Sequence, residues 1–272
     1  MSILTMTEAE YRAINAISQS DLVMLSKSPQ HYKQGFVEQT EAMKLGTVLH
    51  LARFEPRRFH EQILIEPETI GGEKVNKRLK AHRDFLKMFH EQNKEKIILT
   101  STQFENTMGM LNALANNQDV VNLFQVGEPE ATRTWRWNDH DCKGRADWIG
   151  VDANGKRYGV DLKKTQSARK DDFERTIWNR MYYLQAWWYC HGFELDYFLF
   201  IAIDERAPHG IGIYKADTTM LEAGEKKAKS LIKKLDECEK EQNFHSYTKG
   251  IETVFLPAWT ASQFGLEETE NE

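Results

Sequence analysis

Gly144-Arg145-Ala146-Asp147-Trp148-Ile149-Gly150-Val151 and Tyr158-Gly159-Val160-Asp161-Leu162-Lys163-Lys164-Thr165 are two neighbouring runs rich in strand-forming residues. The connection between them contains Asn154-Gly155, a dipeptide that is a strong turn signal. The two runs therefore predict an antiparallel hairpin, and the rest of the chain is interpreted around it.

The register of this hairpin decides what its side chains can do. If Val151 faces Arg157, the connection is five residues long and Asp147 lies opposite Asp161. Opposed side chains have Cβ atoms about 4.5–5.5 Å apart, and Lys163 falls on the same face as Asp161 because strand side chains alternate. A two-residue Asn-Gly turn would shift the register by one and turn the two Asp side chains to opposite faces.

Two carboxylates held together repel each other unless a proton or a cation lies between them. A hard divalent ion that prefers oxygen ligands, Mg²⁺ or Mn²⁺, suits such a pair. Val160 and Leu162 alternate with Asp161 and Lys163, so one face of the strand is apolar and packs on a core. The alternative is a solvated hairpin whose Asp and Lys side chains form weak surface ion pairs.

Composition excludes a broadly basic nucleic-acid coat, because the net charge of the 272 residues is −5 and the pI is about 6.0. The local balance differs: residues 143–170 contain eight Lys or Arg and three Asp, a net charge of +5. This excess predicts a phosphate-binding patch, with a charge-rich solvated surface as the alternative.

The cysteines and the hydropathy of the chain indicate which classes of protein are unlikely. Cys142, Cys190 and Cys238 are widely spaced with no C-x-x-C, which argues against a disulfide framework or a zinc ribbon. The first ten residues are polar and acidic, unlike a signal peptide, and no apolar run approaches about 20 residues. We expect a soluble, cytoplasmic protein.

Periodicity and capping signals predict an α/β domain with a helical N-terminal part, 1–126, before an α/β core, 127–266. Ser18 with Asp21, and Ser28 with Pro29, are predicted helix starts. Further helices are predicted over 41–54, 75–92, 101–124, 170–190 and 218–242, and strands over 62–65, 131–137, 197–203 and 210–214. The acidic stretch 267–272 is predicted to be disordered.

Two helices carry further candidate residues. On the 41–54 helix, Gly46 is expected to allow close packing, and His50 follows one turn later. A lone His on a half-apolar helix is more often a packed boundary residue than a ligand. On the 170–190 helix, Gln185 and Tyr189 are four residues apart and share one face.

A Gly-Arg-x-Asp strand, an Asp-x-Lys strand and a Gln-x-x-x-Tyr helix, in this order, resemble the PD-(D/E)XK nuclease superfamily in its RecB-like branch. The resemblance is closest to the RecE-type exonucleases of phage recombination and extends over nearly the whole chain, including Ile17–Ser20, Ser28-Pro29 and Leu45–His50. It implies a restriction-endonuclease-like core, a mixed sheet with an antiparallel meander flanked by helices, in a single nuclease domain over 1–266.

The resemblance also implies roles for individual residues. The positions that correspond to metal ligands are His50, Asp147, Asp161 and the Leu162 carbonyl. For His50, the resemblance therefore favours a metal ligand over a packed boundary residue. Lys163 and Gln185 correspond to catalytic positions, and Glu130 to an added acidic group, with Glu128 as the alternative. Relatives often have Thr where this chain has Lys164. The candidate DNA contacts are Arg145, Lys164, Thr165, Arg169, Lys170 and Tyr189.

The activity implied is that of a Mg²⁺-dependent exodeoxyribonuclease, with Mn²⁺ as a substitute. It would degrade linear double-stranded DNA from its ends, 5′ to 3′, and leave single strands for recombination. A ring-like homo-oligomer and a single-strand annealing protein are the implied partners, and no membrane is expected. The alternatives are a structure-specific or restriction-like endonuclease and an inactive DNA-binding module of the same fold.

Overall fold

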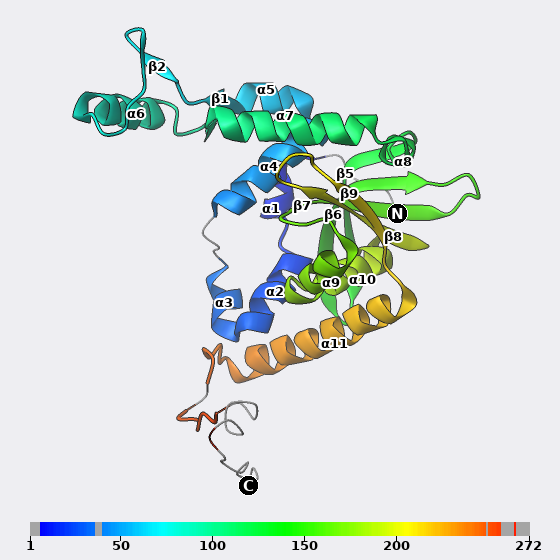
Figure 1. Cartoon of the computed structure of the whole chain (residues 1–272). Helices are drawn as coiled ribbons and strands as arrows, with labels where there is room; N and C mark the ends of the chain where they lie inside the picture. Colours follow the sequence, from blue (N-terminus) through cyan, green and yellow to red (C-terminus); the bar gives the residue numbers. More distant parts are fainter. Residues whose placement is uncertain (1–5, 36–39, 249, 257–263, 265–272) are drawn as a thin grey trace.

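The computed structural model describes residues 6–35, 40–248, 250–256 and 264. Within these ranges the centre of the molecule is a five-stranded mixed sheet in the order β5-β6-β7-β8-β9 (Figure 1). β7 and β8 are parallel, and the other pairs are antiparallel. The predicted α/β class and the predicted meander are confirmed. The strands are β5 Gly127–Trp137, β6 His140–Val151, β7 Arg157–Thr165, β8 Tyr197–Asp204 and β9 Ile211–Lys215.

The β6–β7 hairpin has the register that the acid pair requires. Val151 pairs with Arg157, which places Asp147 and Asp161 opposite each other one position beyond the last paired residues. The five-residue connection is therefore confirmed, and the two-residue turn is excluded.

Asp152 explains why the longer connection forms. Its Oδ1 accepts hydrogen bonds from the amides of Asn154 and Lys156, both at 2.9 Å. Gly155 adopts a φ of 77°, a left-handed conformation that costs glycine little. Asp152 thus holds the loop through its side chain, and the Asn-Gly pair supplies the turn within it.

Helices cover both faces of the sheet (Figure 1). One face packs on α2 Gln19–Lys27, α9 Lys170–Asn179, α10 Tyr182–Phe193 and α11 Thr218–Glu241. The other packs on α4 Glu41–Phe54, α7 Ser101–Asn116 and α8 Gln118–Leu123. β8 serves both cores, with Phe198 and Phe200 in the first and Leu199 and Ile201 in the second, as its continuous apolar run predicts.

The N-terminal helices begin where their caps predict. Ser18 and Asp21 form a reciprocal capping box at the start of α2. Ser28 caps α3 Pro29–Gln34, and Pro29 occupies its first position. α4 has the predicted bounds. The other described helices before residue 63 are α1 Glu8–Ala13 and α5 Pro56–Gln62.

Residues 63–99, called the arm below, project from the body beside α5 and α7 (Figure 1). The parallel pair β1 Ile63–Ile65 and β4 Ile97–Leu99 forms the base of the arm. Between these strands lie the short hairpin of β2 Thr69–Ile70 and β3 Glu73–Lys74, and then α6 Lys80–Gln92. α6 begins five residues later than its periodicity predicts.

Two long predicted helices are each divided in two. The 101–124 segment breaks at Asn117, whose Oδ1 accepts a hydrogen bond from the amide of Val120 at 3.1 Å and caps α8. The 170–190 segment breaks at Met181, which has a φ of 53°. Apolar periodicity continues across both breaks, so it did not reveal them.

The expected packing role of Gly46 is wrong. A Cβ at Gly46 would meet no atom within 4 Å, so the helix does not need a glycine there for close approach. The close approach is instead at Gly224 of α11, where a Cβ would lie 2.3 Å from the carbonyl oxygen of Tyr183 on α10.

Three further predictions concern the chain as a whole. All three cysteines are free thiols, as expected. In the described part of the chain, no helix combines the length and the apolar character needed to cross a membrane. The acidic stretch 267–272 lies outside the described residues.

Candidate active site

Three acidic residues lie on one line across β5, β6 and β7. Ala131 pairs with Ala146 in the β5–β6 register, which places Glu130 opposite Asp147. Asp161 lies opposite Asp147 on its other side. Adjacent strands are about 4.8 Å apart, so carboxylates on such a line can converge on one ion. These three residues, with His50 and Lys163, are called the acid cluster below.

The structure decides which glutamate of β5 belongs to the cluster. Glu130 has a φ of 49°, in the left-handed region that non-glycine residues seldom adopt, and its side chain is 19% exposed. Glu128 pairs with Ile149 further along the strand and is exposed. Such a backbone conformation costs on the order of 1–3 kcal/mol and often marks a functional site.

His50 reaches the cluster from α4, which packs on the face of the sheet opposite to α10. Its Nε2 lies 2.8 Å from the carbonyl oxygen of Leu162, and its Nδ1 lies 3.3 Å from Oδ1 of Asp147. The other oxygen of Asp147 accepts the amide hydrogen of Leu162 at 2.7 Å. Where the β6–β7 pairing ends, the Asp147 side chain therefore accepts the Leu162 amide hydrogen in place of a backbone carbonyl. His50 contacts the other oxygen of the same carboxylate.

The two carboxylate oxygens of Asp161 contact two different side chains, Gln185 of α10 and Lys163 of β7. Its Oδ1 accepts a hydrogen bond from Nε2 of Gln185 at 2.5 Å, and its Oδ2 lies 2.6 Å from Nζ of Lys163. The ammonium of Lys163 also lies 4.6 Å from the ring centroid of Tyr182. Sequence reasoning did not single out Tyr182, because nothing local links its ring to Lys163.

Arg145 joins the cluster to the N-terminal helices. Its Nε donates to Glu130 at 2.7 Å, and its terminal nitrogens lie 3.1 Å from Glu8 and 3.9 Å from Glu55. The side chain is 7% exposed. Glu8 and Glu55 also escaped the sequence reasoning, since both lie far from β6 in the chain.

Burial and the charges of neighbouring groups shift the pKa values of this site toward or above neutral pH. Burial and the charge of Asp147 raise the pKa of Glu130 to about 7, and burial raises the pKa of Asp161 to about 6. Burial disfavours protonated His50, but the charge and hydrogen bond of Asp147 outweigh it and raise the pKa of His50 to about 9. A bound cation would displace these protons and relieve the repulsion.

The donor set fits a divalent metal ion. One ligand atom each from His50, Glu130 and Asp147 lies within 4.8 Å of the others. The carbonyl of Leu162 is next to His50, and Asp161 is opposite Asp147. Carboxylate and carbonyl oxygens suit Mg²⁺ and Mn²⁺, and a neutral imidazole favours Mn²⁺ of the two.

Three of the predicted DNA contacts are engaged inside the protein. Arg145 binds the carboxylates described above. Nζ of Lys164 lies 2.5 Å from Glu205, and the Lys164 side chain is 7% exposed. The hydroxyl of buried Tyr189 donates to the carbonyl of Arg145 at 2.9 Å, so Tyr189 packs beneath the sheet.

The other predicted DNA contacts lie at the end of β7 and the start of α9. Thr165 donates its hydroxyl to the carbonyl two residues later. Arg169 and Lys170 are exposed and lie 3.0 Å from Asp171 and 3.7 Å from Glu174, respectively. Surface pairs of this kind are weak and leave a cation available to another anion.

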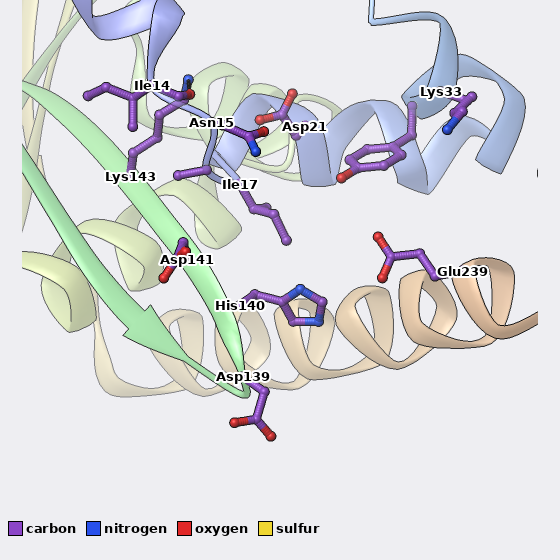
Figure 2. Close-up of a pocket in the computed structure, with 12 residues that line it drawn as sticks. Ile14, Asn15, Ile17, Asp21, Lys33, Asp139, His140, Asp141, Lys143 and Glu239 are labelled. Atoms are coloured by element: carbon purple, nitrogen blue, oxygen red, sulfur yellow. Dashed lines mark hydrogen bonds between the residues drawn. The ribbon is translucent and has the colours of Figure 1, made fainter.

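A separate pocket of about 480 Å³ lies between the 14–17 loop, the β5–β6 turn and α11 (Figure 2). Figure 2 shows His140, Asp141 and Glu239 at its edge, and His140 pairs with Asp236 at 2.7 Å. None of the lining residues belongs to the acid cluster, so the pocket has no part in the chemistry of that site.

Fold and acid cluster together define a PDDEXK-like domain. The chain belongs to the family described as "PDDEXK-like domain of unknown function (DUF3799)", which matches residues 13–255. No curated protein matches the chain.

Two solved structures are similar to different degrees. One, from Eubacterium rectale, is described as a "Putative exonuclease" and has a TM-score of 0.61 and 11% identity, covering 96% of this chain and 98% of that one. At this identity the likeness supports the fold alone. The other, SSO0001, has a TM-score of 0.30 and 17% identity over 70% of this chain and 83% of its own, and carries no argument.

Proposed function

We propose that the protein is a metal-dependent deoxyribonuclease. The observation that supports this best is the meeting of Asp147, Asp161, Lys163 and His50 at the point where β6 and β7 separate. These residues come from two strands and a helix, and their side chains would be costly to bury together without a function. Membership in a PDDEXK-like family supports the same class of enzyme.

His50, Glu130, Asp147, Asp161 and the Leu162 carbonyl would hold the ion. A divalent ion bound there would polarise a phosphodiester and lower the pKa of a water molecule. The chain's own groups would do the rest: Lys163, held by Asp161, would orient the attacking water or offset charge developing on the phosphate. Gln185 fixes the orientation of Asp161, and Arg145 fixes that of Glu130.

The finer proposal is an exonuclease of the RecE type that degrades linear duplex DNA from its ends, 5′ to 3′, with Mg²⁺ as the working ion. On the same resemblance we propose a role in phage-type recombination in the cytoplasm. The expected partners are further copies of the chain in a ring and a single-strand annealing protein. Exposed Arg169 and Lys170 remain proposed phosphate contacts near the site.

The substrate distinguishes the exonuclease from an endonuclease of the same fold. The protein is incubated with Mg²⁺ and equal masses of linear duplex and covalently closed circular DNA. An exonuclease consumes the linear DNA and leaves the circle intact. Linearisation of the circle would identify an endonuclease instead. Cleavage of neither, with duplex binding retained, would identify a binding module.

A further inference from the structure

The basic residues of the arm are arranged differently from those near the acid cluster. Residues 74–87 contain six Lys or Arg and one acidic residue, Asp84, a net charge of +5. All six basic side chains are exposed, and they are called the arm cations: Lys74, Lys77, Arg78, Lys80, Arg83 and Lys87. Over the whole arm the excess is smaller, because Glu66, Glu68, Glu73, Glu91 and Glu95 lie outside this segment.

In the described part of the chain, four of the six arm cations have no carboxylate partner, and one of these four, Arg83, is bound to backbone carbonyls. Lys77 lies 3.1 Å from Glu66, and Lys80 lies 2.9 Å from Asp84. In the part of the chain that the structure describes, Lys74, Arg78 and Lys87 form no ion pair. Near the acid cluster, by contrast, Arg145 and Lys164 are bound to acids from other elements. The arm therefore offers positive charge that no internal group neutralises.

Five of the arm cations, all except Lys74, are gathered at α6 and the loop before it. On α6, His82 and Leu86 are buried, and Lys80, Arg83 and Lys87 lie together on an exposed side at helical spacing. Arg83 also donates hydrogen bonds to the carbonyls of Lys77 and Arg78 at 3.1 and 2.6 Å. These bonds hold the basic loop before α6 against the basic face of the helix.

The arm is anchored on the helix that carries His50. Leu99 of β4 and Phe59 of α5 pack with Val48 and Leu51 of α4 in one buried cluster. Within the arm, Nδ1 of His82 accepts the amide hydrogen of Asn76 at 2.9 Å. The base of the arm is thus packed on α4, and α6 lies further out, beyond β1 (Figure 1).

We propose that the arm cations bind the phosphate backbone of duplex DNA away from the point of scission, an inference that rests on the proposed nuclease function. The 13 residues of α6 extend for about 20 Å, the length of about six base pairs. Contacts to phosphates fix position without selecting sequence, which suits a general nuclease. Leu86 of α6 is buried and Phe85 and Phe89 are half-buried, which disfavours membrane insertion, and the exposed cations favour a polyanion.

The test compares two full-length variants with equal loss of charge. In the first, Lys74→Gln, Arg78→Gln and Lys87→Gln remove three of the arm cations. The control carries Lys226→Gln, Lys233→Gln and Lys240→Gln, three exposed lysines on α11 at the other end of the molecule (Figure 1). Binding of a short fluorescent duplex is measured by anisotropy in EDTA over a series of salt concentrations, and melting curves check that both variants fold.

The arm variant is expected to lower the slope of log K against log salt by about 2.7, at about 0.9 per lost phosphate contact, while the control keeps the wild-type slope. An unchanged slope in the arm variant, or an equal fall in both variants, overturns the proposal. It is also overturned if the arm variant loses binding to phosphatidylglycerol vesicles while its duplex slope stays as in the wild type.

Mg²⁺-dependent hydrolysis by the same samples distinguishes a failure of the arm proposal from a failure of the nuclease proposal. If the wild type cleaves DNA and the arm slope is unchanged, the nuclease proposal stands and the arm proposal fails. If the arm slope falls but no sample cleaves DNA, the arm proposal stands and the nuclease proposal fails. When both hold, the arm variant needs more DNA for its half-maximal rate and reaches the wild-type rate at saturation.

Discussion

His50 and Asp147 form the contact through which a proton and a metal ion would compete. With a pKa of about 9, His50 is protonated at neutral pH and can donate to Asp147 and to the Leu162 carbonyl. An imidazole binds a metal ion only when it is neutral. Below about pH 9, an ion that binds to a ring nitrogen of His50 must therefore displace the proton on that nitrogen.

We predict that the affinity for Mn²⁺ rises with pH between about 7.5 and 9, by up to tenfold per unit, and levels off above that range. The lower limit lies above the pKa of Glu130, about 7, so that His50 dominates the change. His50→Gln should bind Mn²⁺ more weakly and lose the pH dependence. Calorimetric titration at several pH values measures both effects. Equal pH dependence in the variant and the wild type would show that His50 is not a ligand.

Arg145→Gln leaves the half-buried carboxylate of Glu130 without its closest cation. We expect a loss of about 3 kcal/mol in the free energy of unfolding, measured in urea. Glu130→Gln in the same chain should restore part of this loss, because the pair would then both be neutral. If Arg145→Gln weakens DNA binding and leaves stability unchanged, the guanidinium faces the DNA instead.

How far the site could be predicted differs from residue to residue. Asp147, Asp161 and Lys163 were predictable because strand alternation and hairpin register are local properties. The choice between Glu128 and Glu130 was not, since it depends on the left-handed backbone at Glu130.

At the scale of the elements, two helical glycines show whether helix propensity or packing determines the effect of a substitution on stability. Gly46→Ala on α4 adds a methyl group where no atom lies within 4 Å, so it should stabilise the protein by about 0.5–1 kcal/mol. Gly224→Ala on α11 would press against the carbonyl of Tyr183 and should destabilise it by about 1–3 kcal/mol. Urea unfolding of the two variants measures both. The same sign of change in both would contradict this packing of α10 on α11.

Elements with a capping signal were easier to predict than breaks within periodic segments. Ser18 and Ser28 each combine a cap with a matching residue inside the helix, and both helices begin as predicted. At Asn117 and Met181 the apolar pattern continues on both sides, and only the cap at Asn117 offered a local signal for a break.

Over the whole molecule, charge counting along the sequence gave a misleading location for free positive charge. Two cations of the 143–170 excess, Arg145 and Lys164, meet Glu8, Glu55 and Glu205, which the fold brings from distant segments. The arm, whose net charge is modest, keeps exposed cations that form no ion pair in the described part of the chain. A local count cannot anticipate partners that come from other elements, and that is why the arm was missed.

The most direct measurement is the hydrolysis of end-labelled linear duplex by the wild type and by Asp161→Asn, each with Mg²⁺ and with EDTA. The amide keeps the shape of the Asp161 side chain but leaves Lys163 without its closest carboxylate, so a melting curve and duplex binding in EDTA check that the variant folds and binds DNA. We predict cleavage by the wild type in Mg²⁺ alone, and a rate at least about a hundredfold lower in the variant, about 2.7 kcal/mol in barrier. Cleavage by pure Asp161→Asn at the wild-type rate, or by the wild type in EDTA, would contradict a metal-dependent site at the acid cluster.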